Sequence, residues 1–195
     1  MKPKVSILVP FRTDNGPRAD AWKWCEKRWR YLIPEAEIVM GTDPTNGVFS
    51  LSIANNDAAR KAKGDIFLCM GSDFIAERSW YDNGLKHFQT GDHVAVAPHS
   101  QIWRLDKGIS KRIMKAPVDH PLPAPDEYHV VTAFGGLWFM NRQDYFDLGG
   151  YDETYRGWGG EDTDFLHRMR EVGSVLRTDG VILHLWHERM KWEEK

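Results

Sequence analysis

Residues 157–164 read Gly157-Trp158-Gly159-Gly160-Glu161-Asp162-Thr163-Asp164 and place three carboxylates directly after a glycine-rich segment that carries one large aromatic ring. Glycine adopts positive φ readily and lets the backbone approach a ligand closely. The residues that follow, 165–170, are predicted to be helical, and the helix dipole favours acidic residues at a helix start. That effect accounts for one or two of the three carboxylates, so the segment is also a candidate ligand-binding loop.

The composition indicates one globular domain that spans residues 1–195. A chain of 195 residues can bury a substantial core, and a hydrophobic content of 42% argues against a disordered protein. The net charge of −2 argues against a protein whose whole surface is built for nucleic acid. Nine tryptophans mildly favour a carbohydrate or nucleotide ligand, because aromatic rings stack on sugar faces and bases.

The cysteines and the N-terminal residues bear on the compartment. Cys25 lies in a helical pattern and Cys69 in an apolar strand pattern, and both are predicted to be buried free thiols in a reducing compartment. The apolar run that ends at Pro10 is too short for a signal peptide or a membrane span. We therefore expect a soluble cytoplasmic protein without a transmembrane segment.

Strands and helices alternate along the first half of the chain, which is typical of an α/β fold with a parallel sheet and helices on both faces. We predict strands at residues 5–9, 37–40, 66–70, 93–97, 137–140 and 181–186, and helices at 17–31, 52–63, 79–89 and 142–148. Residues 98–130 hold five of the ten prolines and show no clear period, so a long loop or an ordered excursion is expected there.

Polar residues follow the predicted strands at their carboxyl ends, where open α/β sheets bind ligands. Arg12 is either a surface cation or a planar donor for a phosphate or a base. Asp43 either caps a turn or accepts a hydrogen bond from a ribose or a base. The chain has no P-loop, no G-x-G-x-x-G after the first strand and no G-x-S-x-G elbow. A nucleotide held through a metal ion remains possible on these residues.

A metal site is indicated by Asp73 together with His184 and His187. Asp73 directly follows an apolar strand and by itself is more typical of a Gly-Ser-Asp turn. Two imidazoles three positions apart add nitrogen ligands, and such a mixed set suits a borderline divalent ion such as manganese. Residues three apart in a strand point to opposite faces, so the hypothesis requires His187 to lie past the strand end or on a turn.

Five segments together resemble glycosyltransferases of the GT-A fold, in particular inverting β-galactosyltransferases and polypeptide N-acetylgalactosaminyltransferases. Residues 157–164 are similar to the WGGED signature of these enzymes, which is the strongest match. The other four similar segments are residues 9–12, 53–59, 134–136 and 149–152. The resemblance implies an α/β fold with a mixed central sheet flanked by helices, and it runs from the first strand to His187.

The resemblance also implies a function and a set of site residues. The protein would be a metal-dependent inverting transferase that moves a sugar from a nucleotide-diphosphate sugar, with uridine diphosphate expected, to an acceptor hydroxyl. Asp73, His184 and His187 would hold Mn²⁺ or Mg²⁺. Asp162 would be the general base and Glu161 would bind donor or acceptor hydroxyls. Donor contacts would come from Pro10, Phe11, Arg12, Asp43, Asn55, Asn56, Ser72, Asp73, Gly136, Trp158 and Gly160.

One departure from the family pattern concerns the metal motif, and two other functions stay open. The D-x-D motif reads Gly71-Ser72-Asp73, so its first acidic residue is missing. A nucleotidyltransferase would share the α/β core and the carboxylate-bound metal, although the basic, glycine-containing stretch at residues 12–18 matches only in part. A non-catalytic module that binds a nucleotide sugar or carbohydrate is the other alternative, but a binding module needs no base such as Asp162.

The acceptor is the least defined part of the prediction. A glycan, a glycoconjugate or a modified nucleic acid would each offer a hydroxyl group. The basic residues Arg104, Lys107, Lys111, Arg112 and Lys115 are typical of a solvated helix face. Lys107, Lys111 and Lys115 would also line up on one face of a helix and contact a phosphate-bearing acceptor.

Overall fold

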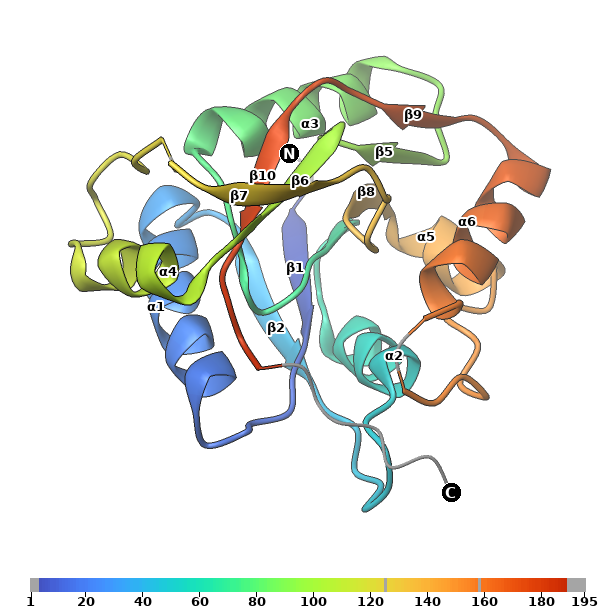
Figure 1. The fold of residues 1–195 in the computed structure, drawn as a ribbon. Helices are drawn as coiled ribbons and strands as arrows, with labels where there is room; N and C mark the ends of the chain where they lie inside the picture. Colours follow the sequence, from blue (N-terminus) through green and yellow to red (C-terminus); the bar gives the residue numbers. More distant parts are fainter. Residues whose placement is uncertain (1–3, 125, 158, 189–195) are drawn as a thin grey trace.

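The computed structural model describes residues 4–124, 126–157 and 159–188, which form two sheets packed among helices (Figure 1). The strands are β1 (Val5–Pro10), β2 (Glu37–Gly41), β3 (Ile66–Cys69), β4 (Phe74–Ile75), β5 (Ala95–Ala97), β6 (Gln101–Leu105), β7 (Tyr128–Val131), β8 (Trp138–Asn141), β9 (Val175–Arg177) and β10 (Val181–His184). The larger sheet has the order β2-β1-β3-β8-β5-β9, and the smaller has the order β4-β10-β6-β7.

The larger sheet is mixed because one strand runs against the others. β1 pairs in parallel with β2 and β3, and β5 pairs in parallel with β9. β8 lies between β3 and β5 and is antiparallel to both. The strands β1, β2, β3, β5 and β9 therefore share one carboxyl edge, and the residues that lead into β8 lie at that same edge. The predicted mixed α/β sheet is confirmed.

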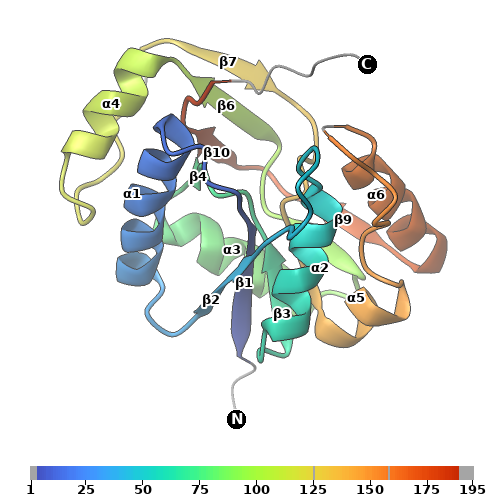
Figure 2. The ribbon, with the colours of Figure 1, turned by 90° about the horizontal axis from the view of Figure 1, so that it is seen from below.

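Helices cover both faces of the larger sheet (Figure 2). They are α1 (Pro17–Leu32), α2 (Leu51–Lys61), α3 (Arg78–Thr90), α4 (Lys107–Lys115), α5 (Arg142–Asp147) and α6 (Glu161–Val172). The alternating residues of β1 explain this arrangement, since Ile7 and Val9 pack with α1 and α3 while Leu8 packs with α2 and α6. A strand buried on both sides is apolar along its whole length, which is why β1 shows no polar alternation.

The excursion at residues 98–130 is ordered, and the expectation of a long loop is wrong for most of it. It contains β6, α4 and the start of β7. Asp106 caps α4 by accepting a hydrogen bond from the N–H of Ile109 at 2.8 Å, a start signal that the prolines of this region obscured. The predicted last strand at residues 181–186 is β10, which ends at His184 and joins the smaller sheet instead of the larger one.

Three further observations bear on the sequence predictions. Cys25 and Cys69 are buried free thiols, as predicted. Among the described residues, no helix combines the length and the apolar character that crossing a membrane would require. α6 begins at Glu161, four residues before the predicted start, so all three carboxylates of residues 161–164 belong to its first turn.

Gly41 at the end of β2 allows α2 to pack directly on the sheet. A Cβ atom at this position would lie 1.8 Å from the carbonyl oxygen of Ala54 and 2.6 Å from the nitrogen of Ala58. Both neighbours are helix backbone and cannot move aside. We predict that Gly41→Ala lowers the free energy of unfolding by about 3 kcal/mol or more, as measured by urea denaturation.

Gly47→Ala is the matched control for this substitution, because a Cβ at Gly47 would meet nothing within 4 Å. It should change the free energy of unfolding by less than about 0.5 kcal/mol. Equal effects of the two substitutions would show that the packing of α2 on β2 is not the cause.

Candidate functional site

The pairing of β4 with β10 brings the three predicted metal ligands together. Asp73 directly precedes β4, and His184 at the end of β10 pairs with Phe74 across the antiparallel ladder. The N–H of Leu185 donates to the carbonyl of Asp73 at 2.9 Å, which extends the contact past the strand end. His187 lies beyond β10, as the metal hypothesis required.

The ligand atoms of these three residues converge. His184 Nε2 lies 3.7 Å from one carboxylate oxygen of Asp73, and His187 Nε2 lies 3.2 Å from the other. One ligand atom of each of the three residues lies within 4.8 Å of the other two. Each side chain keeps some contact with solvent, between 10% and 17% of its surface, so the cluster is accessible to an ion.

The electrostatics around this cluster keep His184 neutral. Burial lowers the pKa of His184, and although the Asp73 carboxylate acts in the opposite direction, His187, Arg104 and Arg18 lower the pKa further. Neutral imidazole is the form that binds a metal. The guanidinium of Arg18 lies 3.1 Å from His187 Nδ1, so a cation from the start of α1 borders the same cluster.

Asp162 lies at the same edge of the larger sheet as Asp73. Because Cys69 pairs with Trp138 in antiparallel β3 and β8, the residues before β8 run beside those after β3. Gly136 is one of them, and a Cβ there would lie 2.5 Å from Asp162 Oδ1. Gly136 also has φ +66°, a backbone conformation that favours glycine.

Burial next to another acid gives Asp162 an unusual proton affinity. Desolvation, followed by the neighbouring Glu161 carboxylate, raises the pKa of Asp162 to about 7, and a hydrogen bond from the Tyr151 hydroxyl at 3.2 Å opposes this rise. A general base works best when its pKa lies near the working pH. The side chain is half-buried, so it combines this environment with access from outside.

The other two carboxylates of the first turn of α6 have structural partners. Glu161 is buried and accepts a hydrogen bond from the N–H of Gly159 at 2.9 Å. Asp164 forms an ion pair with Arg168 one turn later at 2.7 Å. The ordinary preference for acids at a helix start therefore explains Glu161 and Asp164. Asp162 is the carboxylate that this preference leaves unexplained. The predicted contact of Glu161 with a sugar hydroxyl stays a prediction.

Arg12 and Asp43 bind one another at the carboxyl edge. Arg12 donates to the Asp43 carboxylate at 2.9 Å and to the backbone carbonyls of Thr45 and Gly47 at 2.7 Å each. Asp43 also accepts from the N–H groups of Thr45 and Ser50, and these bonds lower its pKa against the effect of burial. The pair thus shapes the loop between β2 and α2, and donor contacts by either residue stay predictions.

Asn56 positions the segment that carries Tyr151. Its amide donates to the Tyr151 carbonyl at 2.8 Å and to Glu153, and its oxygen accepts from the Tyr151 N–H and the Tyr145 hydroxyl. All of its hydrogen-bonding capacity is therefore used inside the protein, which leaves little for the predicted donor contact. Asn55 differs, because its buried side-chain oxygen has no hydrogen-bond partner among the described residues.

The other predicted donor residues that the structure describes fall at the same edge. Pro10 ends β1, the ring of Phe11 lies 6.0 Å from that of Trp22, and Ser72 is buried beside Asp73. Gly160 directly precedes α6 with φ +98°. Trp158 lies outside the described residues. Donor binding by this set stays a prediction.

Sequence reasoning missed Arg18 and Tyr151. Arg18 lies one residue into α1, where its sequence neighbours predict an ordinary surface cation. Tyr151 lies in a segment that was assigned by resemblance, without a role for its hydroxyl. A tertiary contact decides each role. Arg18 contacts His187, 169 positions away, and Tyr151 contacts Asp162, eleven positions away. No local pattern marks such contacts.

Comparison with known proteins identifies the relatives of this chain. Residues 123–185 match a family described as the N-terminal domain of galactosyltransferase. β-1,4-galactosyltransferase 1 of Bos taurus is 25% identical over 182 residues, and that of Mus musculus is 36% identical over 184 residues. Each match covers 92% of this chain and 40% of the relative. The chain thus spans well under half the length of these relatives.

Solved structures agree at the level of the fold. A mutant of the Drosophila β-1,4-galactosyltransferase 7, in complex with manganese, UDP-Gal and xylobiose, superposes with a TM-score of 0.61 at 17% identity, covering 90% of this chain and 64% of that one. GalNAc-T7 with UDP, GalNAc and Mn²⁺ superposes with a TM-score of 0.58 at 16% identity, covering 94% of this chain and 44% of that one. The chain is similar in sequence to β-1,4-galactosyltransferases and has the GT-A fold. The predicted fold is confirmed.

The raised pKa of Asp162 leads to a prediction about stability. Because the folded pKa of about 7 exceeds the ordinary value of 3.8, the folded state retains a proton that the unfolded state loses, so Asp162 destabilises the fold increasingly as the pH rises from about 4 to 7. Asparagine cannot ionise. The free energy of unfolding of Asp162→Asn, relative to the wild type, should therefore rise by roughly 1–3 kcal/mol between pH 5 and pH 8, measured by urea denaturation.

Asp92→Asn removes an exposed carboxylate at a distant surface position and controls for the loss of one negative charge. If the two variants show the same dependence on pH, the environment of Asp162 is not responsible.

Proposed function

We propose that this protein is a metal-dependent glycosyltransferase that uses a nucleotide-diphosphate sugar, with uridine diphosphate as the nucleotide, and transfers the sugar with inversion. The convergence of Asp73, His184 and His187 at the carboxyl edge carries the proposal. The relatives support it, because the solved complexes contain manganese with UDP-Gal or UDP. No observation favours nucleotidyl transfer over glycosyl transfer, and Asp162 argues against a purely binding module.

The donor set fits a borderline divalent cation. One carboxylate oxygen and two imidazole nitrogens form a mixed hard and borderline set that suits Mn²⁺. Metal–ligand distances of about 2.0–2.2 Å place ligand atoms at most about 4.4 Å apart, so ligands within 4.8 Å need only a small side-chain movement. A divalent ion bound here supplies positive charge that stabilises the diphosphate as it leaves the sugar.

Arg18 supports the presence of an anion beside this cluster. Its guanidinium can only donate, so its contact with His187 Nδ1 requires that nitrogen to be unprotonated. The 2.9 Å contact of the same nitrogen with the Glu188 carbonyl requires it to be protonated. Binding a metal through Nε2 favours the second arrangement. Arg18 is then free to pair with a phosphate, which also offsets its repulsion of the metal.

Asp162 is proposed to take the proton of the acceptor hydroxyl. Its half-buried carboxylate is held by the Tyr151 hydroxyl, and the segment that carries Tyr151 is fixed by Asn56. A single base opposite the leaving group leads to displacement with inversion. Gly136 contributes by leaving room for the carboxylate at this edge.

The acceptor is proposed to be a glycan or a glycoconjugate. The Drosophila relative was solved with xylobiose, an oligosaccharide. A nucleic-acid acceptor has no comparable support. Gly71 stands where the D-x-D motif has its first acidic residue. The resemblance assigns His184 as an additional metal ligand, so the proposed site still has three ligands. A cytoplasmic location remains part of the proposal, resting on the sequence alone.

Removal of one imidazole tests the metal site directly. His187→Ala should weaken Mn²⁺ binding in the presence of UDP by at least about tenfold, because one ligand of three is lost. Isothermal titration calorimetry measures this without any need for turnover. His129→Ala, an exposed histidine on β7, is the control and should bind Mn²⁺ like the wild type. Unchanged affinity in His187→Ala would contradict the assignment.

Replacement of the base tests the mechanism. With Mn²⁺ and a panel of UDP-sugars, nucleotide release by the wild type should rise with pH and level off above about pH 7, where Asp162 is ionised. Asp162→Asn should lower transfer by roughly 10²–10⁴-fold, while donor affinity stays close to that of the wild type. Loss of donor binding in this variant would show that Asp162 has a structural role instead.

A further inference from the structure

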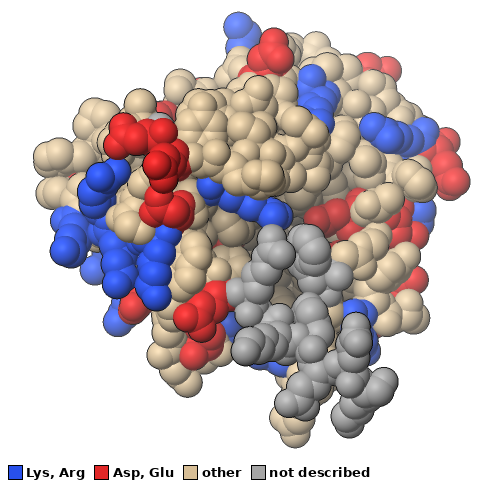
Figure 3. Space-filling model, viewed as in Figure 1, with Lys and Arg blue, Asp and Glu red and all other residues tan. Residues whose placement is uncertain are grey.

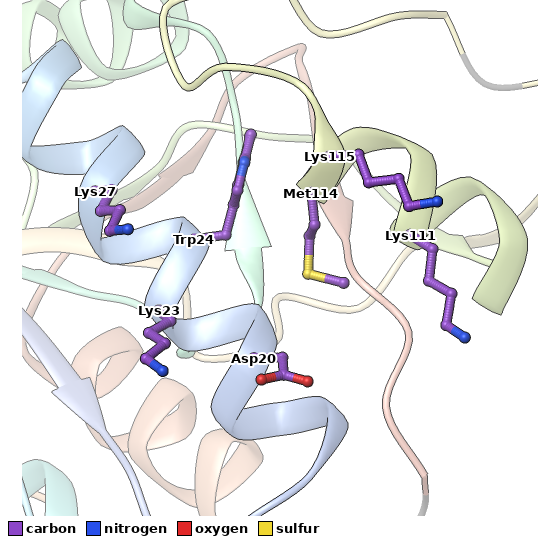
Figure 4. Close-up of a pocket in the computed structure, with 7 residues that line it drawn as sticks. All are labelled: Asp20, Lys23, Trp24, Lys27, Lys111, Met114 and Lys115. Atoms are coloured by element: carbon purple, nitrogen blue, oxygen red, sulfur yellow. The ribbon is translucent and has the colours of Figure 1, made fainter.

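A basic groove lies between α1 and α4, outside the residues assigned to the donor and the metal. It encloses a volume of about 440 Å³ and is open to solvent (Figure 4). Lys23 and Lys27 line it from α1, and Lys111 and Lys115 line it from α4, while Trp24 and Met114 lie between the two pairs. Figure 3 shows a concentration of Lys and Arg side chains over the region of α4.

The lysine positions follow from the helix repeat. Lys23 and Lys27 are four residues apart, as are Lys111 and Lys115, so each pair occupies one face of its helix. Like charges at this spacing repel one another. Packing α1 against α4 brings the two pairs to the same groove, which adds to the repulsion. An anion in the groove would attract each lysine and so offset this repulsion.

The groove has little acidic compensation. Among the described residues, no carboxylate forms an ion pair with any of the four lysines, and Asp20 is the only acidic residue that lines the groove. The dipole of α4 favours a cation in its last turn, which explains Lys115 but not the α1 pair. All four lysines are exposed, as on a solvated helix face, but neither exposure nor the dipole explains why both pairs line the same groove.

Both walls of the groove contact the segment that carries the metal ligands. From α1, Arg18 contacts His187. From α4, the Ser110 hydroxyl accepts from the N–H of Trp186 at 2.8 Å, and the Lys107 ammonium lies 4.5 Å from the Trp186 ring. Residues 186–187 thus contact both of the helices that form the groove.

We propose that this groove binds a phosphate or sulfate ester group of the acceptor, so that the acceptor is an anionic glycoconjugate. The identification of the bound molecule as the acceptor rests on the proposed function, whereas the anion site itself does not. Ammonium groups bind phosphate as point charges, and four lysines line one hollow. Met114, which is half-buried, supplies apolar surface beside that group, whereas Trp24 is buried and leaves little surface for a sugar.

The shape of the site favours a compact anion over a nucleic-acid backbone. A backbone track requires a stripe of cations along the surface. Here the four lysines line one hollow, and Arg112, the next basic residue of α4, forms an ion pair with Asp126. Asp20 at the edge would repel a chain of phosphates passing through.

The anion site is tested first without donor, metal or turnover. Inorganic phosphate and, separately, inorganic sulfate are titrated into metal-free protein in EDTA and followed by calorimetry. The variant carries Lys23→Gln with Lys111→Gln, one change on each wall. The control carries Lys63→Gln with Lys86→Gln, two exposed lysines elsewhere with the same change in charge. We expect the groove variant to bind about tenfold more weakly and the control to bind like the wild type. The ion bound more tightly identifies the ester.

Three results would overturn the proposal. One is equal weakening in the two variants, which would mean that only net charge matters. Another is no detectable binding of either ion to the wild type. The third is salt-dependent binding of single-stranded DNA that is tighter than binding of both ions and is lost in the groove variant, because the groove would then serve a nucleic acid.

Transfer assays separate this proposal from the proposed function. With acceptors that differ only in one ester group, the groove variant should raise KM for the charged acceptor about tenfold and leave kcat and the neutral acceptor unchanged. If the protein hydrolyses the donor but binds anions equally well in the groove variant, the proposed anion site is wrong and the proposed transferase function stands. If anion binding depends on the groove lysines but no nucleotide sugar is turned over, the anion site stands and the proposed transferase function is wrong.

Discussion

The antiparallel pairing of β4 with β10 is the interaction on which the rest of the site depends. It joins residues more than a hundred positions apart, and the backbone bond from Leu185 to Asp73 extends it to the point where His187 can turn back. Only two residues of β4 take part. Without this short ladder, Asp73 would be an ordinary turn residue after β3 and the two histidines would lie at the end of a surface strand.

The second constraint is the desolvation of charge at one edge of the larger sheet. Neutral His184 and protonatable Asp162 both result from burial beside charged neighbours, and the two shifts run in opposite directions because one group is a base and the other an acid. The structure compensates with hydrogen bonds instead of counter-ions at Asp162, through Tyr151. The same edge therefore offers a neutral imidazole ligand, His184, and a carboxylate base, Asp162, whose pKa is about 7.

Local patterns predicted most of the fold and failed where they were weak. The apolar run of β1 and the alanine-rich α2 were recognisable because burial on both faces and helical spacing leave clear periods. The basic residues of α4 were interpreted as a helix face, but the bounds of the helix were not predicted, because the prolines from Pro117 onward dominated the composition of the region. β10 was found as a strand, but its sheet was not, because strand partners are chosen by surfaces far apart in the chain.

The sequence by itself determined the α/β class, the candidate ligands Asp73, His184 and His187, and the acidic start of α6, because each is a property of residue type and spacing. Only the tertiary structure decided that Tyr151 holds Asp162, that Arg18 borders the metal ligands, and that lysines of α1 and α4 line one groove. These depend on contacts between distant segments, whose energies come from burial and from charge at close range. Neither quantity exists until the chain has packed.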